Sequence, residues 1–297
     1  MSKFVPALIV AGLVALASAG DAFAGSLTAA TGPVKVNGKA ATLPVELKKG
    51  DTVETGAATA TFKSNAGDVV TIDRDTTAKS EGTEDGVEYL FVVSGVATGD
   101  LSDKTSIGVS VSWASAAKGT RTEVRVEAPS DRPGVEGRFR AIKGAGAWLR
   151  NADISTWLPE GNSVTLWRDR SKKGGMCFRS SQQNTARVEI TKRVAGGDIN
   201  ISVPRATSGC VEDVANNKTK ISNEITSNKQ DKIKIETEFG SKSTAEVGPG
   251  PYALIDNQTG GIEIIDDTSD DSVGEEIPTY DPVDDASDVS TLRKTKR

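Results

Sequence analysis

The sequence of 297 residues contains no histidine and only two cysteines, two methionines and thirteen leucines. The absence of histidine removes the side chain that most often acts as a general base or as a metal ligand. After the N-terminal segment, no apolar run approaches the ~20 residues that a membrane-spanning helix requires. These absences argue against a histidine-dependent enzyme, a metalloenzyme and a multispanning membrane protein.

The abundant residues favour strands. There are 28 valines, 17 isoleucines and 29 threonines, and such β-branched side chains fit pleated strands better than helices. With 36% apolar residues, the chain can also build a core. We predict a mostly β protein with a short-stranded, sandwich or barrel-like N-terminal module and a second β-rich region.

Residues 1–24 have the features of a secretory signal. Lys3 precedes the apolar run Phe4–Ala19, and Ala22-Phe23-Ala24 has the small-x-small form of a cleavage site. Because the apolar run is shorter than the ~20 residues of a membrane span, we expect cleavage before Gly25 rather than an uncleaved anchor. The prediction is a periplasmic or secreted protein with no membrane span after cleavage.

Cys177 and Cys210 are the only cysteines. In an exported chain, an even pair of cysteines predicts one disulfide bond. A redox-active pair is disfavoured because the spacing is far from Cys-x-x-Cys. Two distant thiols without histidine also predict no metal site, and nothing in the sequence suggests a cofactor.

Turn and strand patterns recur along the chain. Asn37-Gly38 is a strong two-residue hairpin signal because both turn positions need a positive φ. Strands are predicted at 58–63, 69–73, 89–93, 96–100 and, as one alternating strand, 107–113. The polar stretch Glu212–Asp231 is predicted to be a long loop.

One of these patterns matches a known family. The order Gly32-x-Val34-x-Val36, Leu47-x-x-Gly50-Asp51-x-Val53-x-Thr55-Gly56 and Ala58-x-Ala60-x-Phe62 resembles the FecR domain. The resemblance covers about residues 26–115. It implies a small β module of the bacterial periplasm that contacts a partner, in which Gly50, Asp51, Thr55 and Gly56 are structural positions of the motif.

Four segments are therefore expected: a signal peptide at 1–24, a FecR-like β domain at 25–115, a second β-rich domain with the disulfide at 116–265, and a tail at 266–297. From Asp266 to Leu292 the tail has ten acidic and no basic residues, and four basic residues follow. Such a segment cannot bury enough apolar surface to offset its ordering entropy. We predict that the tail is disordered.

Catalytic motifs are weak throughout. Ser115-Ala-Ala-Lys118 matches Ser-x-x-Lys, but the partner motifs of the penicillin-recognising enzymes are missing. Asp68, Asp73 and Asp75 suggest calcium, although a solvated turn is the favoured interpretation. We predict no catalytic residue and no enzyme activity, with a carboxylate-dependent hydrolase as a minor alternative.

Candidate binding residues are Trp148, Trp157, Trp167, Arg168 and Arg170. The tryptophans either fill the core or the seam between the β regions, which is the favoured interpretation, or act as stacking platforms for sugar rings. The arginines either decorate a hairpin tip or bind an anionic polymer; no nucleic acid is expected. The predicted function is non-catalytic binding or scaffolding of a protein or glycan in the cell envelope. The alternative is a self-assembling structural component of the envelope or of a surface appendage.

Overall fold

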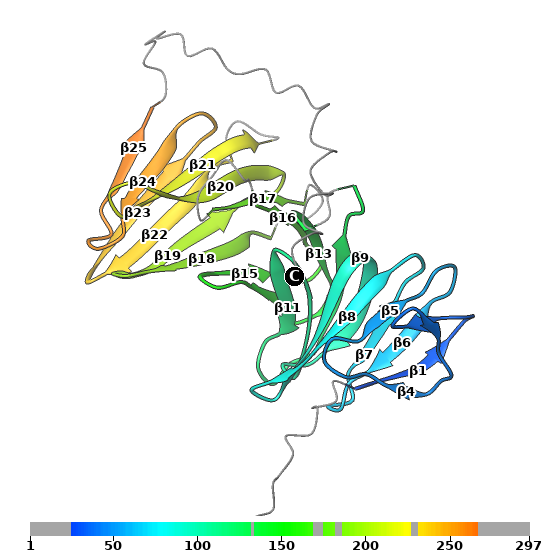
Figure 1. Ribbon diagram of the computed structural model, residues 1–297. Helices are drawn as coiled ribbons and strands as arrows, with labels where there is room; N and C mark the ends of the chain where they lie inside the picture. The colour runs from blue at the N-terminus through cyan, green and yellow to red at the C-terminus, as the bar shows by residue number, and fades with distance from the viewer. Residues whose placement is uncertain (1–24, 132–133, 169–174, 182–185, 227–230, 267–297) are drawn as a thin grey trace, which may run out of the picture. The chain divides into compact units, whose positions relative to one another are not determined.

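The structure is a computed structural model, which describes residues 25–131, 134–168, 175–181, 186–226 and 231–266. This part of the chain consists of 25 strands joined by turns and contains no helix (Figure 1). The prediction of a mostly β protein is confirmed. The predicted signal peptide, the tail from residue 267 onward and Arg170 lie outside the described residues.

The strands form two sheets that share one long strand, β9 (Val87–Leu101). Sheet A has the order β4 (Val45–Glu46), β1 (Ser26–Ala30), β6 (Ala60–Lys63), β7 (Val69–Ile72), the second half of β9, β12 (Thr122–Ala128), β13 (Glu136–Gly144), β16 (Ser163–Trp167), β17 (Met176–Ser180), β20 (Thr207–Val214), β21 (Lys218–Thr226), β24 (Tyr252–Asp256) and β25 (Ile262–Ile265).

Sheet B has the order β3 (Lys39–Ala40), β2 (Lys35–Val36), β5 (Thr52–Glu54), β8 (Thr77–Glu84), the first half of β9, β10 (Thr105–Val109), β11 (Ser112–Ala116), β14 (Ala147–Arg150), β15 (Ile154–Leu158), β18 (Val188–Val194), β19 (Gly197–Val203), β22 (Ile233–Phe239) and β23 (Ser241–Val247). Only the pair β9–β10 is parallel among these neighbours. Antiparallel pairing suits a chain whose strands are joined by short turns.

From β12 onward, successive hairpins alternate between the two sheets. The hairpin β12–β13 belongs to sheet A, β14–β15 to sheet B and β16–β17 to sheet A again, and this order continues to β24–β25. Each hairpin pairs with the preceding hairpin of its own sheet. The boundary predicted after residue 115 falls within β11, one residue before its end, and strand pairs cross it, since β12 pairs with β9. The division into two domains stays a prediction.

Alternate residues of both sheets point into one shared core. Phe62, Phe139 and Phe178 are its largest apolar side chains. Lys192 on β18 also points inward, with only 1% of its surface exposed. Its ammonium lies 3.0 Å from Asp153, which precedes β15 of sheet B, and 3.0 Å from Asp213, on β20 of sheet A. This buried cation therefore joins the two sheets.

Several predicted elements are confirmed or corrected. The Asn37-Gly38 hairpin is confirmed, because both residues have positive φ between β2 and β3. The two strands predicted at 89–93 and 96–100 are halves of β9, which passes from sheet B to sheet A at Gly95. A Cβ at Gly95 would lie 2.4 Å from the Thr76 hydroxyl oxygen, so glycine permits this close passage.

Two other predictions are wrong. The single strand predicted at 107–113 is two strands, β10 and β11, that form a hairpin. The loop predicted at Glu212–Asp231 contains the end of β20 and all of β21, with a turn at Asn216 and Asn217. Its inward positions include the buried polar residues Thr219 and Asn223, which are hydrogen bonded to Asn257 and to the Val247 carbonyl. Because these inward positions are polar, β21 lacks the alternation of apolar and polar residues by which a strand is predicted.

Candidate functional site

Trp148 and Trp157 lie side by side on the outward side of sheet B. They are directly opposed on β14 and β15, and their ring centroids are 5.1 Å apart at an interplanar angle of 54°. Both are partly buried, whereas the strand neighbours of Trp148, Ala147 and Leu149, are buried in the core. The favoured interpretation of these tryptophans as core residues is therefore wrong.

A second aromatic group lies on the neighbouring strands of the same face. Trp113 on β11 contacts Tyr89 and Phe91 of β9 at centroid distances of 5.1 and 5.8 Å. Gly108 on β10 lies opposite Trp113, and a Cβ there would come within 2.3 Å of the indole. The missing side chain at Gly108 thus leaves room for the indole ring beside the backbone of β10.

The two groups are adjacent because β11 pairs with β14. Ser115 lies opposite Trp148, and Trp113 lies opposite Arg150. We call the set Tyr89, Phe91, Trp113, Trp148 and Trp157 the aromatic face. It extends across β9, β10, β11, β14 and β15, and it brings together residues that are up to about seventy positions apart in the chain.

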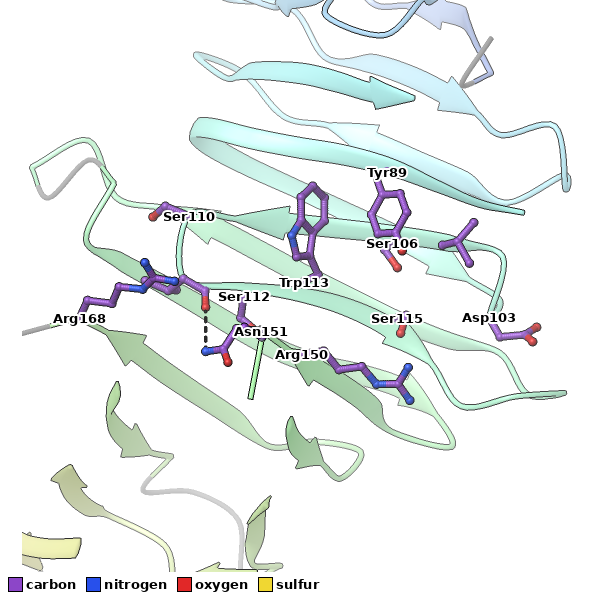
Figure 2. A pocket seen from close by; sticks show the side chains of 13 residues that line it. Tyr89, Asp103, Ser106, Ser110, Ser112, Trp113, Ser115, Arg150, Asn151 and Arg168 are labelled. Atoms are coloured by element: carbon purple, nitrogen blue, oxygen red, sulfur yellow. Dashed lines mark hydrogen bonds between the residues drawn. The ribbon is translucent and has the colours of Figure 1, made fainter. Parts of the chain in front are cut away.

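Two hollows of about 390 Å³ each border this face. Figure 2 shows the first hollow: Tyr89 of β9 and Trp113 of β11 lie beside each other, and Arg168 lies at the opposite end from Tyr89. Arg150, the last residue of β14, and Asn151, which follows it, also line this hollow. The second hollow is lined by Trp148, Ser155, Thr191 and Arg193 among others. Both hollows share Arg150, Asn151 and Ala152, so they adjoin along the end of β14.

Several polar groups at the aromatic face are available to a ligand. Arg150 is exposed and lies over the ring of Trp148 at 5.7 Å, with no carboxylate partner among the described residues. The indole N–H groups of Trp113, Trp148 and Trp157 likewise have no hydrogen-bond partner in that part of the chain. Aromatic planes beside unengaged donors are typical of sites that hold polar ligands with apolar faces.

The Tyr89 hydroxyl is able to donate a hydrogen bond to a ligand, whereas the Asn151 side chain is already hydrogen bonded within the protein. Burial, with additional repulsion from Glu84 and Asp85, raises the pKa of Tyr89 above its ordinary value, so its hydroxyl remains protonated at neutral pH and can donate. Asn151 is held in place, because its Nδ2 donates to the Val111 carbonyl at 3.4 Å and its Oδ1 accepts from the Ile154 amide at 3.0 Å. Asn151 thereby fixes the turn where the two hollows meet.

The other predicted binding residues are only partly brought together. Arg168 is exposed and lines the first hollow. Trp167 lies on the outward side of β16, in sheet A, with Arg179 at 5.9 Å from its ring centroid. The structure therefore separates Trp167 from Trp148 and Trp157, which belong to sheet B.

The positions of the FecR-like motif lie in turns away from the aromatic face. Gly50 and Gly56 have φ values of +94° and +51°. Asp51 accepts hydrogen bonds from the Asn37 side chain at 2.8 Å and from the Lys48 amide at 2.7 Å. The Thr55 hydroxyl donates to the Asp73 carbonyl at 2.6 Å. The side chains of Asp51 and Thr55 thus stabilise the chain turns around β5.

The remaining candidates are structural. Asp68 is fully buried, lies 3.1 Å from Arg121 and accepts hydrogen bonds from the amide and hydroxyl of Ser102 at 3.0 and 2.7 Å, so the solvated-turn interpretation is wrong for this residue. Asp73 pairs with Arg125 at 3.4 Å. No group of three metal-ligating side chains occurs in the described residues. The predicted disulfide joins Cys177 and Cys210, which are directly opposed on β17 and β20.

No protein-family model, no curated protein and no solved structure matches this chain. Within the described ranges, no helix is long and apolar enough to cross a membrane.

Sequence reasoning identified Trp148 and Trp157 but missed Tyr89, Phe91, Trp113 and Arg150 as members of the same surface. Alternation within each strand marks these four as outward-facing. Their proximity, however, depends on the register of β9 with β10, β10 with β11 and β11 with β14, and a single sequence does not specify these pairings.

Proposed function

We propose that this protein binds a glycan on the aromatic face of sheet B and has no catalytic role. The observation that carries the proposal is the alignment of five partly buried aromatic rings on the outward side of one sheet. In most strands of this molecule, outward positions are polar or charged. A contiguous aromatic surface at such positions is typical of an interaction site.

The chemistry of the face favours a sugar polymer. The C–H faces of pyranose rings are apolar and pack on aromatic planes, while their hydroxyls need donors and acceptors at the rim. Trp148 and Trp157 supply adjacent planes, tilted at 54° to one another. Arg150, the Tyr89 hydroxyl and the free indole N–H groups supply hydrogen-bond donors at the edge of the aromatic face. The two hollows beside this face provide space for the parts of a sugar chain that do not stack on the rings.

The proposed setting is the cell envelope, as a periplasmic or secreted protein. The Cys177–Cys210 disulfide is compatible with an oxidising compartment. The signal-like residues 1–24 and the resemblance of residues 26–115 to the FecR domain support the same setting. Peptidoglycan is then the first glycan to test.

The test is retention of the full exported protein on insoluble peptidoglycan, cellulose and chitin. We expect the double variant Trp148→Ala/Trp157→Ala to lose at least about tenfold in affinity, which is ~1.4 kcal/mol. Trp167→Ala is the matched control, because Trp167 is also a partly buried outward tryptophan but belongs to sheet A. Arg168→Ala tests the far end of the first hollow. Equal retention of the double variant and wild type, or no retention on any of the polysaccharides, would overturn the proposal.

A further inference from the structure

The outward side of sheet A carries four arginines on three neighbouring or nearby strands. Arg125 lies on β12, Arg138 and Arg140 on β13, and Arg179 on β17. Arg125 is paired with Asp73 at 3.4 Å, and Arg138 lies 2.9 Å from both Glu127 and Glu136. Two of the four charges are thus compensated by carboxylates.

The other two arginines have no such partner. Arg140 and Arg179 are exposed, and neither forms an ion pair with any residue that the structure describes. Arg179 contacts the ring of Trp167 at 5.9 Å, a cation–π contact that limits the orientations of its guanidinium. These two guanidinium groups are therefore available for an external anion.

Strand register places both arginines beside free hydroxyls. Arg140 is directly opposite Ser163, and Arg179 is directly opposite Thr165. Ser163 and Thr165 are two residues apart on β16 and so point to the same side of the sheet. Their hydroxyl groups have no hydrogen-bond partner within the described ranges. The two arginines thus flank these two hydroxyls, Arg140 from β13 and Arg179 from β17, at successive outward positions of β16.

A hollow of about 400 Å³ opens between these side chains, lined by Arg140, Gly161, Ser163, Thr165, Arg179, Ser180 and Ser181. No acidic side chain is among its lining residues. The Ser180 hydroxyl is engaged, because it donates to the Pro204 carbonyl at 2.6 Å. The hollow therefore combines two uncompensated positive charges with two free hydroxyl donors.

We propose that this hollow binds a tetrahedral oxyanion, a phosphate or sulfate group, independently of the aromatic face. A guanidinium presents parallel N–H donors that match two oxygens of such an anion. Two guanidinium groups and two hydroxyls approaching from three strands suit an anion with four oxygens better than a carboxylate with two. The group is either a free ion or an ester on a polymer.

Calorimetric titration of the full chain with inorganic phosphate, sulfate and acetate at matched ionic strength tests the proposal. We expect phosphate or sulfate to bind at least tenfold more tightly than acetate. The double variant Arg140→Gln/Arg179→Gln should lose at least tenfold in that affinity, whereas Arg140→Lys/Arg179→Lys should lose less because the charge remains. Circular dichroism shows whether each variant is folded.

Arg125→Gln is the matched control, since Arg125 lies on the same face but is paired with Asp73, and it should bind the anion as wild type does. Equal weakening by Arg125→Gln would reduce the effect to general surface charge and overturn the site, as would unchanged binding by the double glutamine variant. Titration with a phosphorylated and with a sulfated polysaccharide separates the sources: tighter binding of either polymer than of the free ion identifies an ester, and equal binding identifies the ion.

Discussion

The outward sides of the two sheets follow the same construction and carry different chemistry. In both sheets, alternate residues are buried in the shared core, and the residues between them face outward. On sheet B the outward positions from β9 to β15 hold five aromatic rings, whereas on sheet A the strands β12 to β17 hold four arginines. Because the core uses only inward positions, the fold is compatible with either surface.

The two faces are also stabilised differently. The aromatic face is held by ring contacts and by glycines that let the rings approach the backbone, as at Gly108 and Gly146. Sheet A has a covalent link between β17 and β20 and ion pairs around Arg125 and Arg138. We therefore expect different substitutions to affect sheet A and the aromatic face: loss of the disulfide or of an ion pair in sheet A, and a new side chain at a glycine beneath the rings of the aromatic face.

The largest expected effect is loss of the disulfide. Replacing both Cys177 and Cys210 by serine should lower the free energy of unfolding by about 3–4 kcal/mol, because the bond closes a loop of about 34 residues in the unfolded chain. Urea unfolding measures this change. Glycan retention at low temperature should persist, since no residue of the aromatic face contacts the bond. A loss below about 1 kcal/mol would contradict the prediction.

A smaller effect is expected from Gly108→Ala. The new Cβ would lie 2.3 Å from the Trp113 ring, so the indole must move, at a cost of about 1–3 kcal/mol. The near-ultraviolet circular dichroism of the tryptophans should change as well. Gly248→Ala is the control, because a Cβ at Gly248 meets no atom within 4 Å. Unchanged stability and spectrum in Gly108→Ala would show that Trp113 is not seated on β10.

The smallest effect concerns Glu88, the inward neighbour of Tyr89 on β9. Burial raises the pKa of Glu88 above its ordinary value, although its carboxylate accepts hydrogen bonds from the Asn65 amide at 2.8 and 3.1 Å. Since the folded pKa lies above the unfolded one, this group contributes stability at acidic pH that is lost as the pH rises through the folded pKa.

Glu88→Gln should therefore flatten the pH dependence of stability above pH ~4.5 and leave the retention of glycan unchanged. Thermal unfolding followed between pH 4 and 8 measures the difference between variant and wild type. If the two proteins lost stability in parallel over this range, Glu88 would have no part in the pH dependence.

Local sequence features predicted much of the fold. Asn37-Gly38 specified its hairpin because both positions need positive φ, and the β-branched composition specified the class. The end of β20 and all of β21 were missed because Thr219 and Asn223 occupy inward positions and are satisfied by partners from distant strands. Likewise, the continuity of β9 through Gly95 depends on its pairing with both sheets, which composition does not reveal.

The site was less predictable than the fold. The residue types of Trp148 and Trp157 suggest a role, but the favoured interpretation as core residues places their side chains on the inward side of the sheet, whereas they lie on the outward side. Phe91, Tyr89 and Trp113 join them only through the register of five strands. Arg140 and Arg179 line one hollow only because β16 pairs with both β13 and β17. Such contacts across strands lie beyond what local patterns encode.

Oxidative footprinting of the tryptophans tests the central claim most directly. The full protein is labelled with and without the glycan that retains it, and oxidation at each tryptophan is read by mass spectrometry. We predict that the glycan protects Trp113, Trp148 and Trp157, on sheet B, and leaves Trp167, on sheet A, unchanged. Protection of Trp167 alone, or no difference at any tryptophan in the bound protein, would contradict a glycan site on the aromatic face.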